Sequence, residues 1–368
     1  MFGLRFIRKL DVVVGVSTLV LLAIGLTVLY SSGIKPAEVA TEIDPTRQFL
    51  YGSIGLLVML FFARLDYRIL RNYSLVLYAL ALLALLYVDV AGATRLGATR
   101  WIDIGFFQFQ PSEFAKPILA IVLAKYFSRN YDNINEWRYW LGSLAYVAPP
   151  MLLVLAQPDL GTGMVFGVIW LAVAIAAKVR WQYLLGLMAS IVAMIPLIVP
   201  RLQPYQRQRL TTFLNPAANP TTTGYNVNQA IIAVGNGGWF GQGLGSGSQS
   251  QGNFLPSQQT DFIFAVLAEK LGFFGGLLTL VAFLVLIARG YWITQMAADR
   301  FGGLLGVALM SMLLFHVFIN VGMNLGIMPV TGIPLPFISA GGSSMIVTMF
   351  AVGVIQSIYM RRRKKEFL

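Results

Sequence analysis

Apolar residues along this chain are gathered into runs of roughly 18 to 22 residues, and each run ends where charged, proline or glycine residues return. The runs begin near residues 11, 48, 73, 112, 139, 161, 181, 262, 302 and 342. An α-helix needs about 20 apolar residues to cross the hydrocarbon core of a bilayer. The pattern therefore predicts an all-α, polytopic membrane protein with about ten transmembrane helices, which form a single integral membrane domain over residues 1–368.

The segments between the runs differ in length on the two sides of this predicted bundle. If successive loops alternate between sides, one side has only short loops, and the other has loops at about 31–47, 92–111, 201–260 and 323–341. The last three are rich in Gly, Pro, Gln, Asn and Ser. A loop of about 60 residues in a membrane protein whose other loops are short usually has a function. We therefore expect the active surface on the side of the long loops.

Composition and charge agree with this picture and orient it. Of the 368 residues, 57% are hydrophobic and only 11% are charged. The chain has 27 basic and 15 acidic residues. In a membrane protein such an excess of basic residues is explained first by the orientation of the protein in the membrane, and only then by binding to nucleic acid. With alternating loops, 18 basic residues fall on the side of the termini, 7 on the side of the long loops and 2 within runs. The positive-inside rule therefore predicts cytoplasmic termini and extracytoplasmic long loops.

The residue types that are scarce exclude several kinds of chemistry. The chain has no cysteine, which excludes thiolate metal sites and Cys nucleophiles. Its single histidine, His316, disfavours a His-based metal site or a Ser-His-Asp triad, and we expect it to be a buried, hydrogen-bonded core residue. The short loops contain no nucleotide-binding signature, so we expect no soluble energy-coupling domain on that side.

Few ionisable side chains occur at membrane depth, where they are costly unless they are paired or face a water-filled cavity. Glu113 and Lys116 open the fourth run, after Pro111 and Ser112, and their i,i+3 spacing puts them on one helical face. Two interpretations stay open. The residues form a self-neutralising ion pair that only solves the problem of burial, or they form part of the wall of a polar cavity.

Two further acids stand where loops of the long-loop side meet apolar runs. Asp159 lies in the short turn before the sixth run, and Asp261 lies where the 201–260 loop meets the eighth. Either could be an ordinary helix N-cap. Between Arg201 and Thr260, however, there are three arginines and no acid. A cationic loop that ends in one carboxylate suits an anionic headgroup arriving beside a base.

The long loops also supply candidates for binding a phosphate. Arg207 and Arg209 provide two guanidiniums at i,i+2, and the planar guanidinium makes bidentate, permanently charged hydrogen bonds to phosphate. The alternative is a loop that faces solvent or lipid headgroups. Arg100 with Trp101 is a similar candidate, and Trp101 could instead be an interfacial anchor.

As a set, these motifs resemble the SEDS family of shape, elongation, division and sporulation proteins, and most closely its rod-shape branch. The most specific segment is GIMPVTGIPLPFISAGGSS at 326–344, which follows Asn320. Supporting matches are FQPSE at 109–113, QPDLGT at 157–162, YQRQR at 205–209 and TDFIFAV at 260–266. In one departure, Lys270 follows Glu269 where a second Glu is frequent.

The resemblance implies a ten-helix glycosyltransferase of the bacterial cytoplasmic membrane, which polymerises lipid II into peptidoglycan strands for cell elongation and rod shape. It implies that Asp261 is the catalytic acidic residue and that Glu113, Lys116 and Asp159 are the intramembrane polar positions of its cavity. It also implies a class B penicillin-binding protein and other elongation-complex proteins as partners, beside lipid II and membrane lipids.

Forming a β-1,4 bond from the α-linked donor inverts the anomeric carbon, which needs a base but no enzyme nucleophile. We expect Asp261 to be that base, and the four cationic side chains to stabilise the polyprenyl pyrophosphate that leaves: Arg100, Lys116, Arg207 and Arg209. A divalent cation, Mg²⁺ or Mn²⁺, could bridge the pyrophosphate and a carboxylate. Two alternatives stay open: a lipid II flippase, because ten spans with intramembrane charge also describe carriers, and the division or sporulation paralogue of the same family.

Overall fold

The computed structural model describes residues 6, 8–33, 45–95, 98–103, 108–201, 206–207, 212–213, 223–252 and 254–363. Within these residues, ten long helices begin within about five residues of the predicted starts, so the all-α prediction is confirmed. They are α2 (Val12–Gly33), α3 (Pro45–Arg64), α4 (Arg68–Ala91), α5 (Pro111–Arg129), α6 (Trp137–Ala156), α7 (Leu160–Ala176), α8 (Trp181–Ile198), α12 (Ile263–Gln295), α13 (Arg300–Asn324) and α14 (Gly342–Met360).

Seven of these described helices are long and apolar enough to cross a membrane by length and composition alone. The other three have identifiable reasons for falling short. α7 and α8 are apolar but shorter, and α5 carries four charged residues, among them Glu113 and Lys116. A helix that carries charge inside the bundle is the expected place for a polar site, because bilayer lipid does not tolerate such residues.

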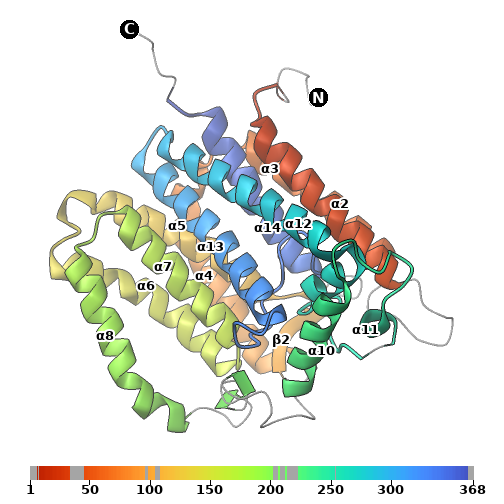
Figure 1. Cartoon of the computed structure of the whole chain (residues 1–368). Helices are drawn as coiled ribbons and strands as arrows, with labels where there is room; N and C mark the ends of the chain where they lie inside the picture. Colours follow the sequence, from red (N-terminus) through yellow and green to blue (C-terminus); the bar gives the residue numbers. More distant parts are fainter. Residues whose placement is uncertain are drawn as a thin grey trace.

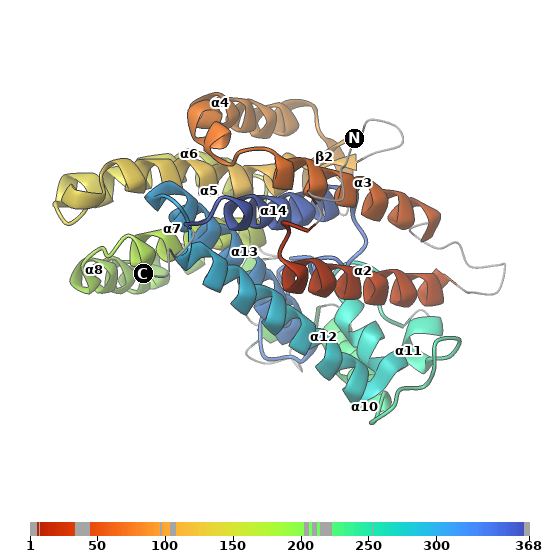
Figure 2. The ribbon, with the colours of Figure 1, turned by 90° about the horizontal axis from the view of Figure 1, so that it is seen from above.

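The helices form one bundle with two distinct ends. Both termini lie at one end, which we call the terminal face, and the long loops lie at the other, the loop face (Figure 1). Seen from above, α13, α14 and α5 occupy the middle, and the other long helices surround them (Figure 2). The spans of α13 and α14 are 78% buried, against 22% for α4 and α6. The central helices therefore offer the most shielded positions for polar side chains.

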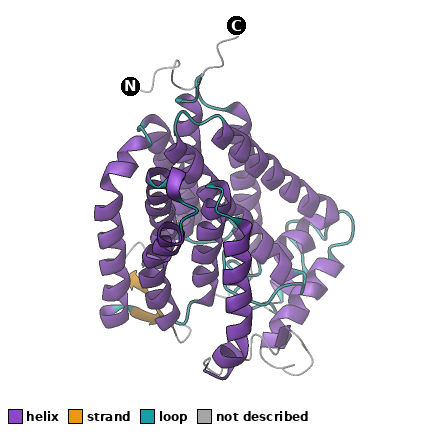
Figure 3. Ribbon diagram, turned by 90° about the vertical axis from the view of Figure 1, so that its left-hand side faces the viewer, coloured by secondary structure: helices purple, strands orange, loops and turns teal. Residues whose placement is uncertain are grey.

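The loop face contains more regular structure than the sequence predicted. In the 92–111 segment, β1 (Ala93–Arg95), β2 (Ala98–Asp103) and β3 (Gln108–Phe109) form an antiparallel sheet in the order β1-β2-β3, with Ala93 opposite Trp101 (Figure 3). The 201–260 segment contains α10 (Thr223–Asn236) and α11 (Ser248–Gln251), and η2 (Val199–Arg201) is a single 3₁₀ turn at its start. A second 3₁₀ turn, η1 (Tyr131–Asn133), joins α5 to α6 at the terminal face. Residues 34–44 of the predicted 31–47 loop lie outside the described residues.

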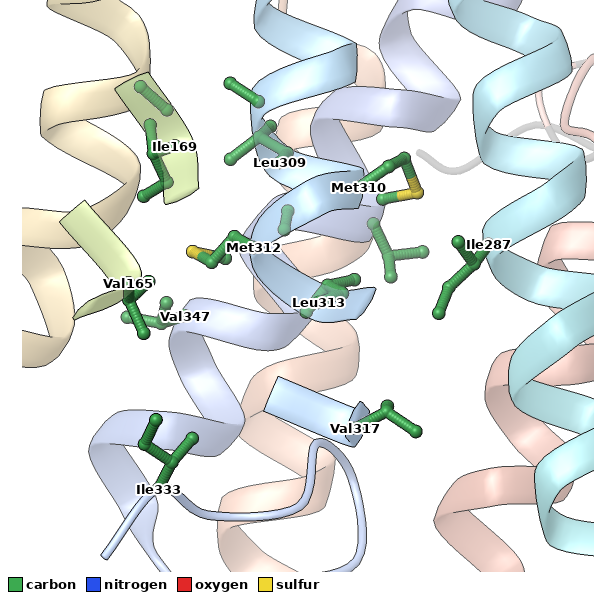
Figure 4. Packing of buried hydrophobic residues seen from close by; sticks show 14 of the residues in the cluster. Val165, Ile169, Ile287, Leu309, Met310, Met312, Leu313, Val317, Ile333 and Val347 are labelled. Atoms are coloured by element: carbon green, nitrogen blue, oxygen red, sulfur yellow. The ribbon is translucent and has the colours of Figure 1, made fainter. Parts of the chain in front are cut away.

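The core packs around α13. Leu309, Met312 and Leu313 of α13 are almost fully buried, and they lie among side chains of α7, α12 and α14 (Figure 4). The approach of α12 to α13 depends on a glycine, because a Cβ at Gly290 would clash with the Met310 side chain. Small residues commonly allow such close contact between membrane helices. α13 is therefore held firmly along its length, including the end that reaches the loop face.

α12 is interrupted at Gly272, whose φ of 69° is not helical. The chain before α11 packs into this break: the Gln242 N–H donates to the Glu269 carbonyl at 2.9 Å, and the Phe273 N–H donates to the Gly238 carbonyl at 2.8 Å. A Cβ at Gly272 would clash with the backbone of Gly241. The break therefore leaves a short, buried first part of α12 and a long second part, joined beside the 237–243 segment.

Candidate active site at the loop face

Asp261 lies directly before α12 and is only partly buried. Its backbone carbonyl accepts hydrogen bonds from Nδ2 of Asn320, at 3.1 Å, and from Nδ2 of Asn324, at 3.0 Å. Phe262, and not Asp261, is the N-cap residue of α12, and its own side chain makes no capping hydrogen bond. Asn324 Oδ1 instead accepts from the Ala265 N–H in the first turn at 2.9 Å. The N-cap interpretation of Asp261 is therefore wrong. Two asparagines of α13 position this residue through its backbone, so its carboxylate is not what fixes the start of α12.

The 326–344 signature segment folds against the start of α12. Asn320 Nδ2 also donates to the Ile333 carbonyl at 2.8 Å. Ser339 Oγ donates to the Thr260 carbonyl at 2.6 Å and accepts from the Leu335 N–H at 2.8 Å. A Cβ at Gly332, which has a φ of 78°, would lie 3.8 Å from Asp261 Oδ2. The signature segment thus supports the backbone beside Asp261 and passes close to its carboxylate.

Asn324 and Ser339 were not singled out from the sequence as site residues. Both belong to a set of buried polar residues in or next to apolar helices, since Asn320 and Asn324 are 0% exposed and Ser339 is 4% exposed. Asn320 and Asn324 are spaced i,i+4, so they share one face of α13. Two amides on one face of an apolar helix are a signal that could have identified them, because buried amides need partners.

A buried group of three ionisable side chains joins α5 to α13. Lys116 Nζ lies 2.7 Å from Glu113 Oε1 and 3.2 Å from His316 Nε2. All three residues are at most 4% exposed. His316 is therefore buried and hydrogen-bonded, as predicted. Glu113 Oε2 and His316 Nδ1 have no hydrogen-bond partner within the described part of the chain, and both interpretations of the Glu113–Lys116 pair stay open.

Asp159 is the N-cap of α7. Its Oδ1 accepts from the Thr162 N–H at 3.2 Å, and its Oδ2 accepts from Thr162 Oγ1 at 2.9 Å. Arg100 of β2 secures the same turn, because its guanidinium donates to the carbonyls of Gln157, at 3.0 Å, and Pro158 and lies 3.8 Å from Asp159 Oδ1. The capping interpretation of Asp159 is confirmed. Arg100 is engaged by the protein itself, which weakens its candidacy as a phosphate ligand.

The predicted acids converge on one short stretch of the signature segment. A Cβ at Gly161, two residues after Asp159, would lie 2.9 Å from the Thr331 carbonyl. Gly332, the next residue, faces Asp261, so Thr331 and Gly332 lie between the two acids. His316 precedes Asn320 by one helical turn and brings the Lys116 group to the same helix. Thr331 Oγ1 and Gln259 Oε1 are further buried oxygens that lack a partner among the described residues.

The structure places the remaining predicted site residues less tightly. Trp101 is half-buried on β2, beside Arg100. Arg207 is exposed in the 201–260 segment, and Arg209 lies outside the described residues. Across the described ranges, no three His, Cys, Asp or Glu side chains come together in the manner of a metal site. The donor set around Asp261 therefore does not fit a closed coordination shell for Mg²⁺ or Mn²⁺, and the cation stays a prediction.

Glu269 and Lys270 hold the 237–252 segment in place. Glu269 accepts hydrogen bonds from the N–H groups of Gln249, at 2.8 Å, and Ser250, at 3.0 Å. Lys270 Nζ donates to Ser31 Oγ of α2 at 2.7 Å and to the Leu244 carbonyl at 3.3 Å. Both side chains are at most 1% exposed. Their role here is structural, since a buried carboxylate and ammonium are satisfied by the segment that they anchor.

Comparison with known proteins gives consistent matches over nearly the whole chain. The family profile FtsW, RodA and SpoVE, described as cell cycle proteins, matches residues 12–364. Peptidoglycan glycosyltransferase MrdB of Escherichia coli (strain K12) is 39% identical over 312 residues, which cover 84% of each chain. Stage V sporulation protein E of Bacillus subtilis (strain 168) is 38% identical over 356 residues, which cover 95% of this chain and 96% of that protein.

A solved structure of another protein has the same fold as this chain. It is described as "Structural coordination of polymerization and crosslinking by a peptidoglycan synthase complex", and it superposes with a TM-score of 0.81 at 29% identity. The superposition covers 95% of this chain and 97% of that one. The similarity therefore extends across all ten long helices described above.

Proposed function

Because the chain belongs to the FtsW, RodA and SpoVE family of SEDS proteins, we propose that it is a peptidoglycan glycosyltransferase with Asp261 as its general base. The observation that carries this assignment is the position of Asp261. It is a partly exposed carboxylate at the loop face, fixed through its backbone by Asn320 and Asn324 and not used as a helix cap. A base has to be positioned firmly and still reach a substrate.

The proposed reaction is a single displacement between two lipid II-type substrates. The acceptor's 4-hydroxyl attacks C1 of the donor sugar while Asp261 takes the hydroxyl proton. The bond from C1 to the pyrophosphate oxygen breaks, and polyprenyl pyrophosphate leaves with the electron pair. The product is a β-1,4 linkage with inversion at C1. No nucleotide is consumed, because the energy of the reaction is stored in the lipid-linked donor.

Charge on the leaving pyrophosphate needs cationic partners at the loop face. Arg100 is occupied by the 157–159 turn, and Lys116 is occupied by Glu113 and His316. Arg207 is exposed on the long loop and is the described cation best suited to reach a headgroup. We therefore assign pyrophosphate binding first to Arg207 and to its neighbour Arg209, and a supporting role to Lys116.

The biological setting follows the same family relationship. We assign the enzyme to cell elongation because the YQRQR motif at 205–209 and a second motif, GSQS at 247–250, resemble the rod-shape branch, with the division and sporulation branches as alternatives. The solved complex is one that coordinates polymerization and crosslinking. A class B penicillin-binding protein is accordingly the partner we propose. The 18 basic residues on the side of the termini favour a cytoplasmic terminal face.

The decisive experiment is polymerisation by purified protein in liposomes with lipid II in the outward-facing leaflet. Asp261→Asn should lower the rate about 10²- to 10⁴-fold, because the amide cannot accept the proton. Asp132→Asn is the matched control, since Asp132 is an exposed aspartate at the opposite end of the bundle. An Asp261→Asn protein that polymerises at the wild-type rate would contradict the assignment. Movement of lipid II across the bilayer without glycan product would instead support the flippase.

A further inference from the structure

A cavity of about 330 Å³ opens at the terminal face, where α4 and α13 begin and α5 ends. Its lining contains four basic residues and one acid: Arg71, Lys125, Arg129, Arg300 and Asp299. We call it the basic cavity. It lies at the opposite end of the bundle from Asp261, so the proposed glycosyl transfer leaves it without a role.

The acid in this lining is already satisfied by the protein. Asp299 Oδ1 accepts from the Gly302 N–H at 2.8 Å, and Oδ2 accepts from the Tyr67 hydroxyl and from Arg68 Nε, each at 2.8 Å. Burial alone would raise the pKa of the Asp299 carboxyl, but these hydrogen bonds outweigh it and hold that pKa below its ordinary value. Asp299 is therefore ion-paired with Arg68, and within the described part of the chain it forms no ion pair with the four basic residues of the lining.

Three of the four basic side chains have no carboxylate partner among the described residues. Arg300 pairs with Asp132 at 3.0 Å and lies over the Tyr131 ring at 4.2 Å. Lys125 Nζ donates to the neutral Ser74 Oγ at 2.9 Å. Lys125, Arg71 and Arg129 form no ion pair with any acid in the described ranges. The basic cavity thus has three uncompensated positive charges facing a common space.

The surroundings of the basic cavity place it where a polar surface meets an apolar one. Arg71 lies one turn into α4. Three apolar or aromatic residues that follow it along the helix are each more than half exposed: Tyr73, Leu75 and Val76. Lys125 lies one turn before the end of α5. The basic cavity thus lies at the ends of membrane-spanning helices, which is where phospholipid phosphates are found, and basic pockets between transmembrane helices bind anionic headgroups.

We propose that the basic cavity binds a phosphate group, held by Arg71, Lys125 and Arg129. Guanidinium forks make bidentate hydrogen bonds to phosphate oxygens, and the ammonium adds a compact point charge. The phosphodiester of an anionic phospholipid and a free phosphate ion present the same oxygens. The exposed apolar surface of α4 beside the cavity favours the lipid as the source.

The test uses full-length protein in nanodiscs and measures binding by native mass spectrometry and by the shift of the unfolding temperature. One arm titrates phosphatidylglycerol into phosphatidylcholine discs, and the other titrates inorganic phosphate. The variant is Arg71→Gln with Arg129→Gln. The control is Arg138→Gln, an exposed arginine of the same face that lies over the Trp137 ring, outside the cavity.

We expect the double variant to bind phosphatidylglycerol roughly 25-fold more weakly than the control, about fivefold for each arginine removed. Loss of inorganic phosphate binding in the same variant would support the site with a free ion as its ligand. Equal affinity of double variant and control in both arms would overturn the proposal. Both arginines are exposed and unpaired among the described residues, so folding should survive. If the double variant does not fold, the single Arg129→Gln variant takes its place, and we expect its affinity for phosphatidylglycerol to be about fivefold lower than that of the control.

Discussion

At the scale of single residues, the site depends on amides that hold the backbone. Asn320 Nδ2 donates to two carbonyl oxygens, those of Asp261 and Ile333, and Asn324 Oδ1 accepts from the Ala265 N–H at 2.9 Å. Asn320 therefore joins the start of α12 to the signature segment. Asp261 is thus held through its backbone carbonyl by both asparagines.

Asn320→Asp tests this arrangement with almost no change in size. The new carboxylate would face two carbonyl oxygens and could not donate to either of them. We expect a loss of about 1–3 kcal/mol in stability and a lower kcat with little change in KM. Thermal unfolding and lipid II polymerisation measure these effects. Ser190→Ala, which removes an exposed hydroxyl from α8, is the control, and an Asn320→Asp protein that matches it would refute the role.

Lys116 is the second residue whose replacement separates two interpretations. Lys116→Met leaves the buried Glu113 carboxylate without its ammonium, which should cost about 3–5 kcal/mol. Adding Glu113→Gln should recover much of this loss if the two residues only neutralise one another. Thermal unfolding of the two single variants and the double variant gives the coupling energy. A stable double variant that no longer polymerises lipid II would show that the pair also serves the reaction.

Individual residue roles were predictable only in part. Asp261 could be singled out as a candidate because a long cationic loop ends at it and a family motif contains it, and its role as a base stays a prediction. The role of Arg100 could not be predicted, because the carbonyl groups to which it donates, in the 157–159 turn, come from a distant part of the chain. The capping role of Asp159 could be proposed, since the bond to Thr162 spans only three residues. Local hydrogen bonds leave a signal in the sequence, and long-range ones do not.

At the scale of elements, helices and their interruptions have different origins. The ten spans follow from local apolar composition, which is why their starts could be read within a few residues. The β1–β3 sheet, α10 and the break in α12 depend on contacts with other segments. Gly272 illustrates this, because a Cβ at this position of positive φ would clash with the backbone of Gly241, which lies in the 237–243 segment.

Gly272→Ala should therefore disrupt the junction between α12 and the 237–243 segment. The added Cβ would clash with the Gly241 backbone at a φ that disfavours Ala. We expect faster proteolysis in the 237–252 segment and a lower unfolding temperature. Gly186→Ala on α8 is the control, because a Cβ there would have no atom within 4 Å. Equal proteolysis rates for the two variants would show that the junction tolerates a side chain.

At the scale of the whole molecule, the two faces have different chemistry. The loop face carries Asp261 and the signature segment, and the terminal face carries most of the basic residues. Such an arrangement suits an enzyme that works on one side of a membrane and is oriented by charge on the other. The side on which each face lies can be measured directly, because the chain has no cysteine.

Single cysteines therefore report orientation without background. The Asn133→Cys substitution lies in an exposed turn of the terminal face, and Asn228→Cys lies at an exposed position of α10 at the loop face. In intact spheroplasts, a membrane-impermeant maleimide should label the Asn228→Cys protein and spare the Asn133→Cys protein until the membrane is permeabilised. The reverse pattern would show that the positive-inside assignment is inverted.

The interruption of α12 also separates a buried part of the helix from an exposed one. Its first part, Ile263 to Lys270, is buried on all sides, whereas Phe273, Leu277 and Leu284 of its second part are exposed, as lipid-facing residues would be. Gly272 marks the boundary between these two parts. The part next to Asp261 is therefore surrounded by protein, whereas the part beyond Gly272 presents apolar side chains at the surface. Asp261, the proposed base, thus precedes a helical segment whose neighbours are protein side chains and not bilayer lipid.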